Sequence, residues 1–365
     1  MVTASIDRFQ QRILGYDLWL LVAPAMASAI GIVMVYTAGQ NSMHYASRQL
    51  LFSVLGLVAM AIFASVDYHR LEQAATPAYV ALLAGLVLIM IPGVGSSQLG
   101  ATRWFAVGPL LIQPSEFAVL GIILAISTYC ARRPDGLTWR DLSRVLLMTG
   151  IPMGLIFIQP DFGTAAIVFV TLFVMLVGAG VPLRVLLGLA LATVLAVVAA
   201  FQFHLLKSYQ VARITAFLHP NSADNYNTLH SMTAIGAGGL FGAGIGHGAE
   251  TTLGFVPSQL TDFIFSAIGE QLGFIGSVAM LVLLGSIAWR VLVIGLGARD
   301  VFGRVLCSGI FAFMAFSTFE NVGMGLGIMP VAGIPLPFIS YGGSAMICFY
   351  AACGIALSIS RRRGR

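Results

Sequence analysis

The chain has 365 residues, of which 58% are hydrophobic and only 9% are charged, and its formal net charge is +5 at pH 7. Apolar runs of this length and number exceed what a soluble core uses and are typical of a helical protein that crosses the membrane several times. The composition therefore excludes a soluble globular enzyme, and contact with anionic lipid explains the positive charge without a nucleic-acid partner.

The apolar runs predict an all-α polytopic membrane protein, since each run can cross about 30 Å of hydrocarbon. Residues 1–17 lack the apolar core of a signal peptide, so we expect the first span to remain as a signal-anchor. No linker or repeat divides the chain, which predicts one transmembrane domain over residues 1–365. The ten predicted spans cover residues 18–39, 48–65, 77–92, 114–131, 145–159, 165–179, 185–203, 263–292, 304–326 and 340–360.

Ten spans place both termini on one side of the membrane, and the 19 Lys and Arg residues then divide unequally between the two sides. Fifteen fall on the side of the termini, which the positive-inside rule assigns to the cytoplasm. The other four are expected outside the cell: Arg48, Arg103, Lys207 and Arg213.

Three outer segments are predicted not to span. Residues 204–262 form a large loop between the seventh and eighth helices, and loops of this length are usually functional or disordered. This loop contains a glycine-rich stretch at 236–248, which is typical of a backbone lying close to lipid or a ligand. The other two segments are 100–116 and 330–344, and the three prolines of the latter exclude a regular helix.

Five carboxylates lie in or at the ends of spans on the outer half, where charge is costly and functional roles are common. For Asp161 we weigh a helix cap against a site role, and for Glu320 we favour a hydrogen bond between helices. Glu270 either orients substrate or pairs with a neighbouring helix, and we favour the pair. Glu116 needs a partner from another span, or its pKa must rise, because Val119 follows it one turn later. Asp262 ends the long loop close to the headgroups, and we favour a functional role for it over a simple helix cap.

The cysteines and outer histidines are less informative. Cys130, Cys307, Cys348 and Cys353 lie in or at the ends of spans without CxxC spacing, so we interpret them as buried small hydrophobes. The outer histidines lack the spacing of metal ligands, which favours solvated loop positions over a metal site.

Several motifs together resemble the shape, elongation, division and sporulation (SEDS) family, whose members include RodA, FtsW and SpoVE. The strongest are TDFIF at 261–265, GEQLG at 269–273 and GIPLPFISYGGS at 333–344. QPSE at 113–116, QPDFGT at 159–164 and IGAGGL at 235–240 match further blocks in the same order. Residues 209–210, 251–255 and 302–304 look more like the elongation member RodA than the division member FtsW.

The resemblance implies a ten-helix peptidoglycan glycosyltransferase that polymerises lipid II, an undecaprenyl-linked substrate, on the outer face of the bacterial cytoplasmic membrane. It implies a class B penicillin-binding protein as partner, together with membrane lipids and the elongation machinery. The family's catalytic aspartate aligns with Asp262. The chain departs from the family pattern at Val119, Ser258 and Leu260, where the family favours Lys, Glu and His.

One carboxylate is enough for this reaction, because undecaprenyl pyrophosphate leaves without being protonated, unlike the alkoxide of a glycosidase. Asp262 is then the general base for the acceptor hydroxyl, and the resemblance implies inversion at the anomeric carbon. The departing pyrophosphate needs positive charge, from arginine or lysine or from a divalent cation, which is the one cofactor we consider. Arg103 and Arg213 are the leading candidates, whereas Arg48 is expected to anchor its helix. The predicted substrate-binding residues are Arg103, Arg213, Lys207, Glu116, Glu270 and Ser340.

Two other classes of function stay open. A transporter that flips lipid II would favour charges spread through the bilayer and inverted repeats, whereas the charges here gather at the outer face. A scaffold that activates a partner polymerase gains support from Val119 and Leu260. A division role is the alternative within the SEDS family.

Overall fold

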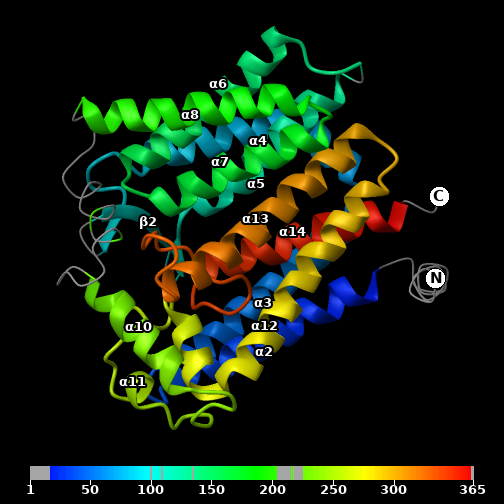
Figure 1. The fold of residues 1–365 in the computed structure, drawn as a ribbon. Helices are drawn as coiled ribbons and strands as arrows, with labels where there is room; N and C mark the ends of the chain where they lie inside the picture. The colour runs from blue at the N-terminus through cyan, green and yellow to red at the C-terminus, as the bar shows by residue number, and fades with distance from the viewer. Residues whose placement is uncertain are drawn as a thin grey trace.

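The structure is a computed structural model that describes residues 17–98, 101–107, 110–133, 135–203, 215, 217 and 225–362. It is a bundle of helices with one small antiparallel sheet, in the order β1-β2-β3, at one end (Figure 1). The elements are α2 (Leu18–Ala38), α3 (Met43–Ser65), α4 (Tyr68–Leu88), β1 (Ser96–Gln98), β2 (Ala101–Val107), β3 (Leu110–Ile112), α5 (Pro114–Ala131), α6 (Trp139–Ile158), α7 (Phe162–Gly178), α8 (Leu183–Gln202), α10 (Tyr226–Ala237), α11 (Ala249–Thr252), α12 (Ile264–Leu296), α13 (Val301–Gly325) and α14 (Gly343–Arg362).

The membrane helices confirm the predicted class. Among the described residues, eight helices are long and apolar enough to cross a bilayer, and α7 and α8 are shorter apolar helices. With these two the bundle has the ten predicted spans, seven before the long loop and three after it. The four cysteines are free and buried, as expected of small hydrophobes.

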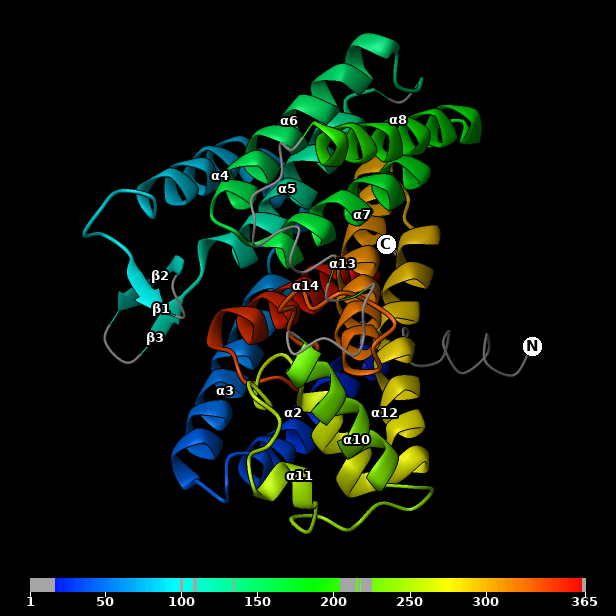
Figure 2. The same ribbon diagram turned by 60° about the vertical axis from the view of Figure 1, so that its left-hand side comes forward.

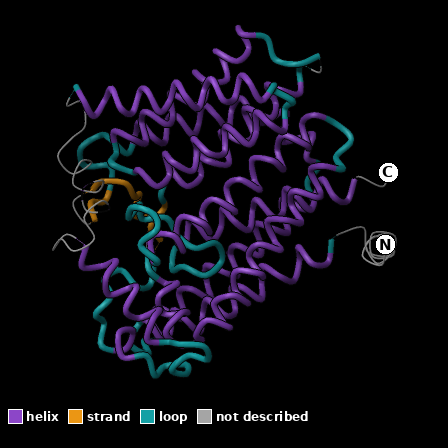
Figure 3. Tube along the Cα trace, viewed as in Figure 1, coloured by secondary structure: helices purple, strands orange, loops and turns teal. Residues whose placement is uncertain are grey.

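Two groups of helices make up the bundle. In Figure 1, α4 to α8 lie together at the top, and α2, α3, α12, α13 and α14 run obliquely below them. The groups are joined by α13, which packs against α5 and α7 as well as α12. The most central helix is α14, which is buried along nearly its whole length and packs most extensively against α3. Figure 3 shows that the strands and many of the loops gather at one end, which we call the pocket end.

The opposite end carries the start of α2 and the end of α14, and we call it the terminal end (Figure 1). Asp17 caps α2 by accepting from the Leu20 N–H at 3.1 Å, and it also receives the guanidinium of Arg290 on α12. The ion pair is almost fully shielded on the Asp17 side, where 1% of the side chain is exposed. It therefore fixes the register of α2 against α12, which run antiparallel.

The structure corrects the sequence analysis at two places. The third span begins at Tyr68 rather than at residue 77, because Asp67 caps α4 and the Tyr68 hydroxyl donates to Asp300 at 2.6 Å. The polar first turns of α4 had lowered the local hydropathy. The segment after α4 was predicted only not to span, and it folds into the three-stranded sheet, in which Ser96 pairs with Trp104 and Phe105 with Ile112.

Candidate active site

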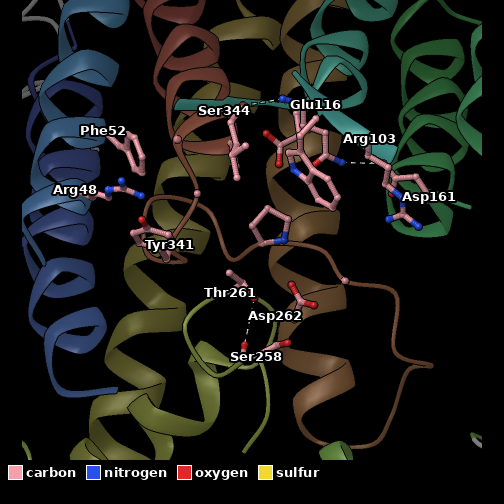
Figure 4. A pocket seen from close by; sticks show the side chains of 18 of the residues that line it. Arg48, Phe52, Arg103, Glu116, Asp161, Ser258, Thr261, Asp262, Tyr341 and Ser344 are labelled. Atoms are coloured by element: carbon pink, nitrogen blue, oxygen red, sulfur yellow. Dashed lines mark hydrogen bonds between the residues drawn. The ribbon is translucent and has the colours of Figure 1, made fainter. Parts of the chain in front are cut away.

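A cavity of about 410 Å³ opens at the pocket end between the two groups of helices. Its walls come from α3, from the sheet, from the beginnings of α5 and α14, and from the loops that precede α7, α12 and α14. Figure 4 shows Asp262 on one side of the cavity, with Arg48 and Arg103 on the flanks and Glu116 opposite. Distant parts of the sequence thus meet around one carboxylate.

Asp262 is held by its backbone. Its N–H donates to the carbonyl of Ser258 at 3.1 Å, in a turn that starts at Ser258 with φ +52°. The side-chain amide of Asn321 donates to the Asp262 carbonyl at 2.8 Å and to the Ile334 carbonyl at 2.7 Å. Gly333 has φ +73°, and a Cβ there would lie 3.5 Å from Asp262 Oδ2. Glycine at 333 therefore lets the backbone pass directly beside the carboxylate.

The proline-rich segment 330–342 forms the wall next to Asp262. Gln49 of α3, which is fully buried, donates to the carbonyls of Ile339 at 3.2 Å and Ser340 at 3.1 Å. The Ser340 hydroxyl donates to the Thr261 carbonyl at 2.6 Å and accepts from the Leu336 N–H at 2.8 Å. The irregular backbone from Leu336 to Ser340 is thus held by protein groups, as membrane proteins require.

The two described arginines of the cavity differ in their contacts. Arg103 on β2 donates through Nε to the Gln159 carbonyl at 2.8 Å and through Nη2 to the Pro160 carbonyl. Its guanidinium therefore supports the turn between α6 and α7 while it lines the cavity. Arg48 on α3 also lines the cavity, and among the described residues it has no hydrogen bond or ion pair with protein. The charge of Arg48 is accordingly available to a ligand.

The carboxylates opposite Asp262 are in contrasting settings. Asp161 caps α7 by accepting from the Thr164 N–H at 3.3 Å, and it also accepts from the Ser115 hydroxyl at 2.7 Å and the Gln113 amide at 3.0 Å. The helix cap that we weighed for it is confirmed. The predicted partner of Glu116 is not found among the described residues, because its Oε2 is buried without a hydrogen bond.

Behind the main cavity lies a smaller one of about 40 Å³. It is lined by Glu116, Val119 and Ser317 among others, and the Ser317 hydroxyl is also buried without a partner. This space holds one or two water molecules by size, and the two unpartnered groups are suitable ligands for them.

Two of the predicted substrate-binding residues do not line the cavity. Glu270 is 1% exposed and accepts from the N–H groups of Glu250 and Thr251, each at 2.8 Å, and from the Thr251 hydroxyl. It thereby holds the start of α11. The favoured pairing of Glu270 with a neighbouring helix is what the geometry shows. Ser340 is 3% exposed and is occupied between Thr261 and Leu336.

The remaining predicted cations, Lys207 and Arg213, lie outside the described residues. Residues that the sequence analysis did not single out include Gln49, Asn321 and Tyr341. The signal for Asn321 was its position beside Glu320 in an apolar span, since a buried amide needs partners. The departure at Leu260 has a simple explanation, because its side chain packs against the core and only its carbonyl, which accepts from the Tyr341 N–H at 2.8 Å, faces the wall.

A resident metal site is not built into the described part of the chain. No three His, Cys, Asp or Glu side chains come together there in an arrangement that could hold an ion. Asp262, Asp161 and Glu116 line the same cavity but are separated across it in Figure 4.

Comparisons with known proteins agree with this geometry. The family FTSW_RODA_SPOVE, described as "Cell cycle protein", matches residues 16–365. The chain is 32% identical to "Probable peptidoglycan glycosyltransferase FtsW" of Geobacter sp. (strain M18), over 96% of this chain and 98% of that protein. It is 33% identical to "Peptidoglycan glycosyltransferase MrdB" of Escherichia coli (strain K12), over 95% and 93%. A solved structure described as "Structural coordination of polymerization and crosslinking by a peptidoglycan synthase complex" contains a chain that is 32% identical, with TM-score 0.83 and coverage of 96% and 99%.

Proposed function

Because this chain belongs to the FtsW/RodA/SpoVE family and is a multi-pass membrane peptidoglycan glycosyltransferase, we propose that it polymerises lipid II at the cavity around Asp262. One observation supports this assignment above the others. The Asp262 carboxylate lines a cavity that is flanked by Arg48 and Arg103, so a base and two cations face the same space.

The reaction needs a proton acceptor beside a bond that breaks easily. The 4-hydroxyl of the acceptor GlcNAc attacks the anomeric carbon of the donor MurNAc, and the bond from that carbon to the pyrophosphate oxygen breaks. The electron pair leaves with undecaprenyl pyrophosphate, while the hydroxyl proton passes to Asp262. Attack opposite to the leaving group inverts the anomeric carbon. The backbone contacts from Asn321 and Ser258 keep the carboxylate in place during this step.

The pyrophosphate charge is assigned to the arginines. Arg48 is a cation in the cavity wall whose charge is not used by described protein groups, and guanidinium groups bind phosphate oxygens in a bidentate manner. Arg103 lies on the other flank with its guanidinium also joined to two carbonyls. This reverses the order that the sequence favoured, in which Arg48 was an anchor. Lys207 and Arg213 stay proposed as further cations.

The pocket end is proposed to face the outside of the cell. The described cations support this, because eleven arginines lie at the terminal end or in its connections and two lie at the pocket end. Both termini are then cytoplasmic. We propose a class B penicillin-binding protein as partner, which is supported by the similarity to a chain of a peptidoglycan synthase complex. We further propose a role in elongation, on the RodA-like residues at 251–255 and 302–304.

Asp262→Asn tests the proposal, because it keeps the shape of the side chain and removes the base. The variant is reconstituted with its partner and lipid II, and glycan strands are separated on a gel. We expect loss of at least 100-fold in polymerisation, the scale of a removed general base. Asp135→Asn, an exposed position between α5 and α6, is the matched control and is expected to keep full activity.

The same preparation separates the rival functions. Glycan synthesis at the wild-type rate by Asp262→Asn would refute the assignment of Asp262 as the general base. Failure of Asp262→Asn to move labelled lipid II between leaflets, with no polymerisation by the wild type, would favour the transporter. Rescue of an elongation-depleted strain but not of a division-depleted strain would support the elongation role.

A further inference from the structure

The glycine-rich loop after α10 completes a break in α12. At Gly273 the backbone of α12 leaves the helical region, with φ 69° and ψ −167°. The loop and the helix exchange four backbone hydrogen bonds across the break: Ala243 N–H to the Glu270 carbonyl (2.9 Å), Gly244 N–H to the Gln271 carbonyl (3.1 Å), Phe274 N–H to the Gly239 carbonyl (2.9 Å) and Ile275 N–H to the Leu240 carbonyl (3.2 Å).

Glycine is required where the two backbones touch. A Cβ at Gly238 would collide with the carbonyl of Gly269, and a Cβ at Gly242 would collide with the carbonyl of Gln271. Further loop N–H groups find acceptors as well, since Gly242 donates to the Gly238 carbonyl at 2.8 Å and Gly246 donates to Gln271 Oε1 at 3.0 Å. These N–H groups of the loop are therefore directed at protein.

The side chains on the other face of this contact are apolar and exposed. Leu240 is 63% exposed, Phe241 81%, Phe274 62% and Ile275 54%. We call these four residues the apolar patch. They come from two segments that the hydrogen bonds bring together, and Figure 2 shows α10, which leads into the loop, beside the beginning of α12.

The depth of the patch follows from the register of α2 against α12. Arg290 pairs with Asp17 at the terminal end, so a hydrocarbon layer of about 30 Å extends along α12 for about 20 residues, to about Glu270. The same distance along α2 ends near Thr37, and a Cβ at Gly246 would lie 3.9 Å from Thr37. Both helices thus place the boundary of the hydrocarbon at the loop.

The patch lies on the lipid side of this boundary. Phe274 and Ile275 follow Glu270 by about one turn toward the terminal end, which is about 6 Å deeper. A tilt of the two helices only increases the number of residues needed to cross the hydrocarbon, and so places the patch deeper still. A non-helical segment is tolerated at such depth when protein satisfies its backbone, and here α12 accepts from the N–H groups of Ala243, Gly244 and Gly246.

We propose that residues 238–246 form a re-entrant segment that inserts Leu240 and Phe241, together with Phe274 and Ile275, among the acyl chains of the leaflet at the pocket end. The occupant of the apolar patch is lipid, because its four exposed side chains carry no charge and lie on the lipid side of the boundary. The segment would anchor α10 and α11 to the membrane surface beside the cavity. This inference does not depend on the proposed reaction.

Site-directed spin labelling of the full chain in proteoliposomes tests it. Phe241→Cys and Phe274→Cys are labelled separately, and the four native cysteines are buried, so the unsubstituted chain provides the blank. Collisions with oxygen, which concentrates in hydrocarbon, are compared with collisions with a water-soluble nickel chelate. Val282→Cys, 65% exposed on α12, is the lipid control, and Asp135→Cys is the water control.

We expect both patch labels to resemble Val282→Cys, with oxygen accessibility severalfold above nickel accessibility. Labels that resemble Asp135→Cys would place the patch in water and overturn the proposal. Labels shielded from both reagents would show that protein covers the patch, either a second copy or another segment of the chain, and would also overturn it. Gel filtration of each variant confirms that it has folded.

Discussion

The side-chain amide of Asn321 donates a hydrogen bond of 2.8 Å to the backbone carbonyl of Asp262. The same amide group donates to the Ile334 carbonyl at 2.7 Å, so one side chain of α13 joins the turn that carries Asp262 to the proline-rich wall. Asn321 is fully buried. The position of the proposed base is thus determined from α13, which does not itself contribute a lining residue to the main cavity.

Replacing Asn321 by Ala is therefore expected to reduce both stability and activity. Two buried carbonyls would lose their donor, at a cost of about 1–3 kcal/mol each. Thermal unfolding in detergent and glycan synthesis from lipid II measure the two effects. Thr318→Val is the control, since that hydroxyl only donates to Met314 within the same helix, and its effect should be small. Normal activity in Asn321→Ala would show that Asp262 is held by other contacts.

Arg48 and Arg103 are expected to fail in different ways. Arg48→Gln should reduce polymerisation at least tenfold with an unchanged unfolding temperature, because its guanidinium is proposed to bind the pyrophosphate and has no partner among the described residues. Arg103→Gln should reduce both, because it releases the carbonyls of Gln159 and Pro160.

Kinetics at several lipid II concentrations, together with thermal unfolding, distinguish the two variants. If Arg48→Gln keeps wild-type turnover, pyrophosphate binding would be assigned to Lys207 or Arg213 instead. Loss of wild-type activity on chelation, with recovery on adding magnesium, would add a divalent cation to the arginines.

Val119→Lys is expected to be tolerated, because an ion pair with Glu116 offsets the desolvation of the buried ammonium. Val119 is 1% exposed, but it lines the cavity of about 40 Å³ beside Glu116, whose Oε2 has no partner. The ammonium would supply one. Val119→Met, of similar length and without charge, separates the ion pair from simple filling of space. A large drop in unfolding temperature for Val119→Lys but not for Val119→Met would show that Glu116 does not form an ion pair with the new ammonium group.

Glu270→Gln is expected to loosen α11 and to leave the KM for lipid II unchanged. Glutamine retains one carbonyl oxygen where the carboxylate accepts from Glu250, Thr251 N–H and the Thr251 hydroxyl, and the lost bonds cost about 1–3 kcal/mol. Hydrogen exchange at residues 249–252 should accelerate. Glu320→Gln is the control, because Glu320 Oε2 has no partner to lose. A raised KM for lipid II, with unchanged hydrogen exchange at residues 249–252, would instead support the substrate-binding role that the sequence analysis proposed for Glu270.

The sequence predicted most of the fold because bilayer thickness acts on each span separately. Hydropathy therefore located ten helices, but it placed the start of α4 too late. Local hydropathy carries no information on the hydrogen bond from Tyr68 to Asp300, which joins two distant parts of the chain. The strands of 96–112 were missed for a similar reason. Each is short and becomes regular only through its neighbour.

The sequence analysis predicted residues that line the cavity, but not the separate role of each residue around it. The motif around Asp262 and the acids Glu116 and Asp161 are local signals, and all three line the cavity. That Ser340 holds the backbone could not be predicted from the sequence, because its partners are the main-chain groups of Thr261 and Leu336, which have no sequence signature. The ranking of Arg103 above Arg48 rested on its position beside a motif, whereas the structure shows which guanidinium already has acceptors.

The break at Gly273 also bears on the order of assembly during synthesis. Residues 238–244 leave the ribosome before α12 has been synthesised. The N–H groups of Ala243 and Gly244 therefore cannot yet donate to the carbonyls of Glu270 and Gln271. Until residues 270–275 of α12 have been synthesised, these N–H groups lack their acceptors. We therefore expect the stretch to stay in water or bound to a chaperone and not to enter lipid. The turn that carries Asp262 lies, in sequence, between the loop and the part of α12 that it pairs with, so that turn is synthesised before the junction can close.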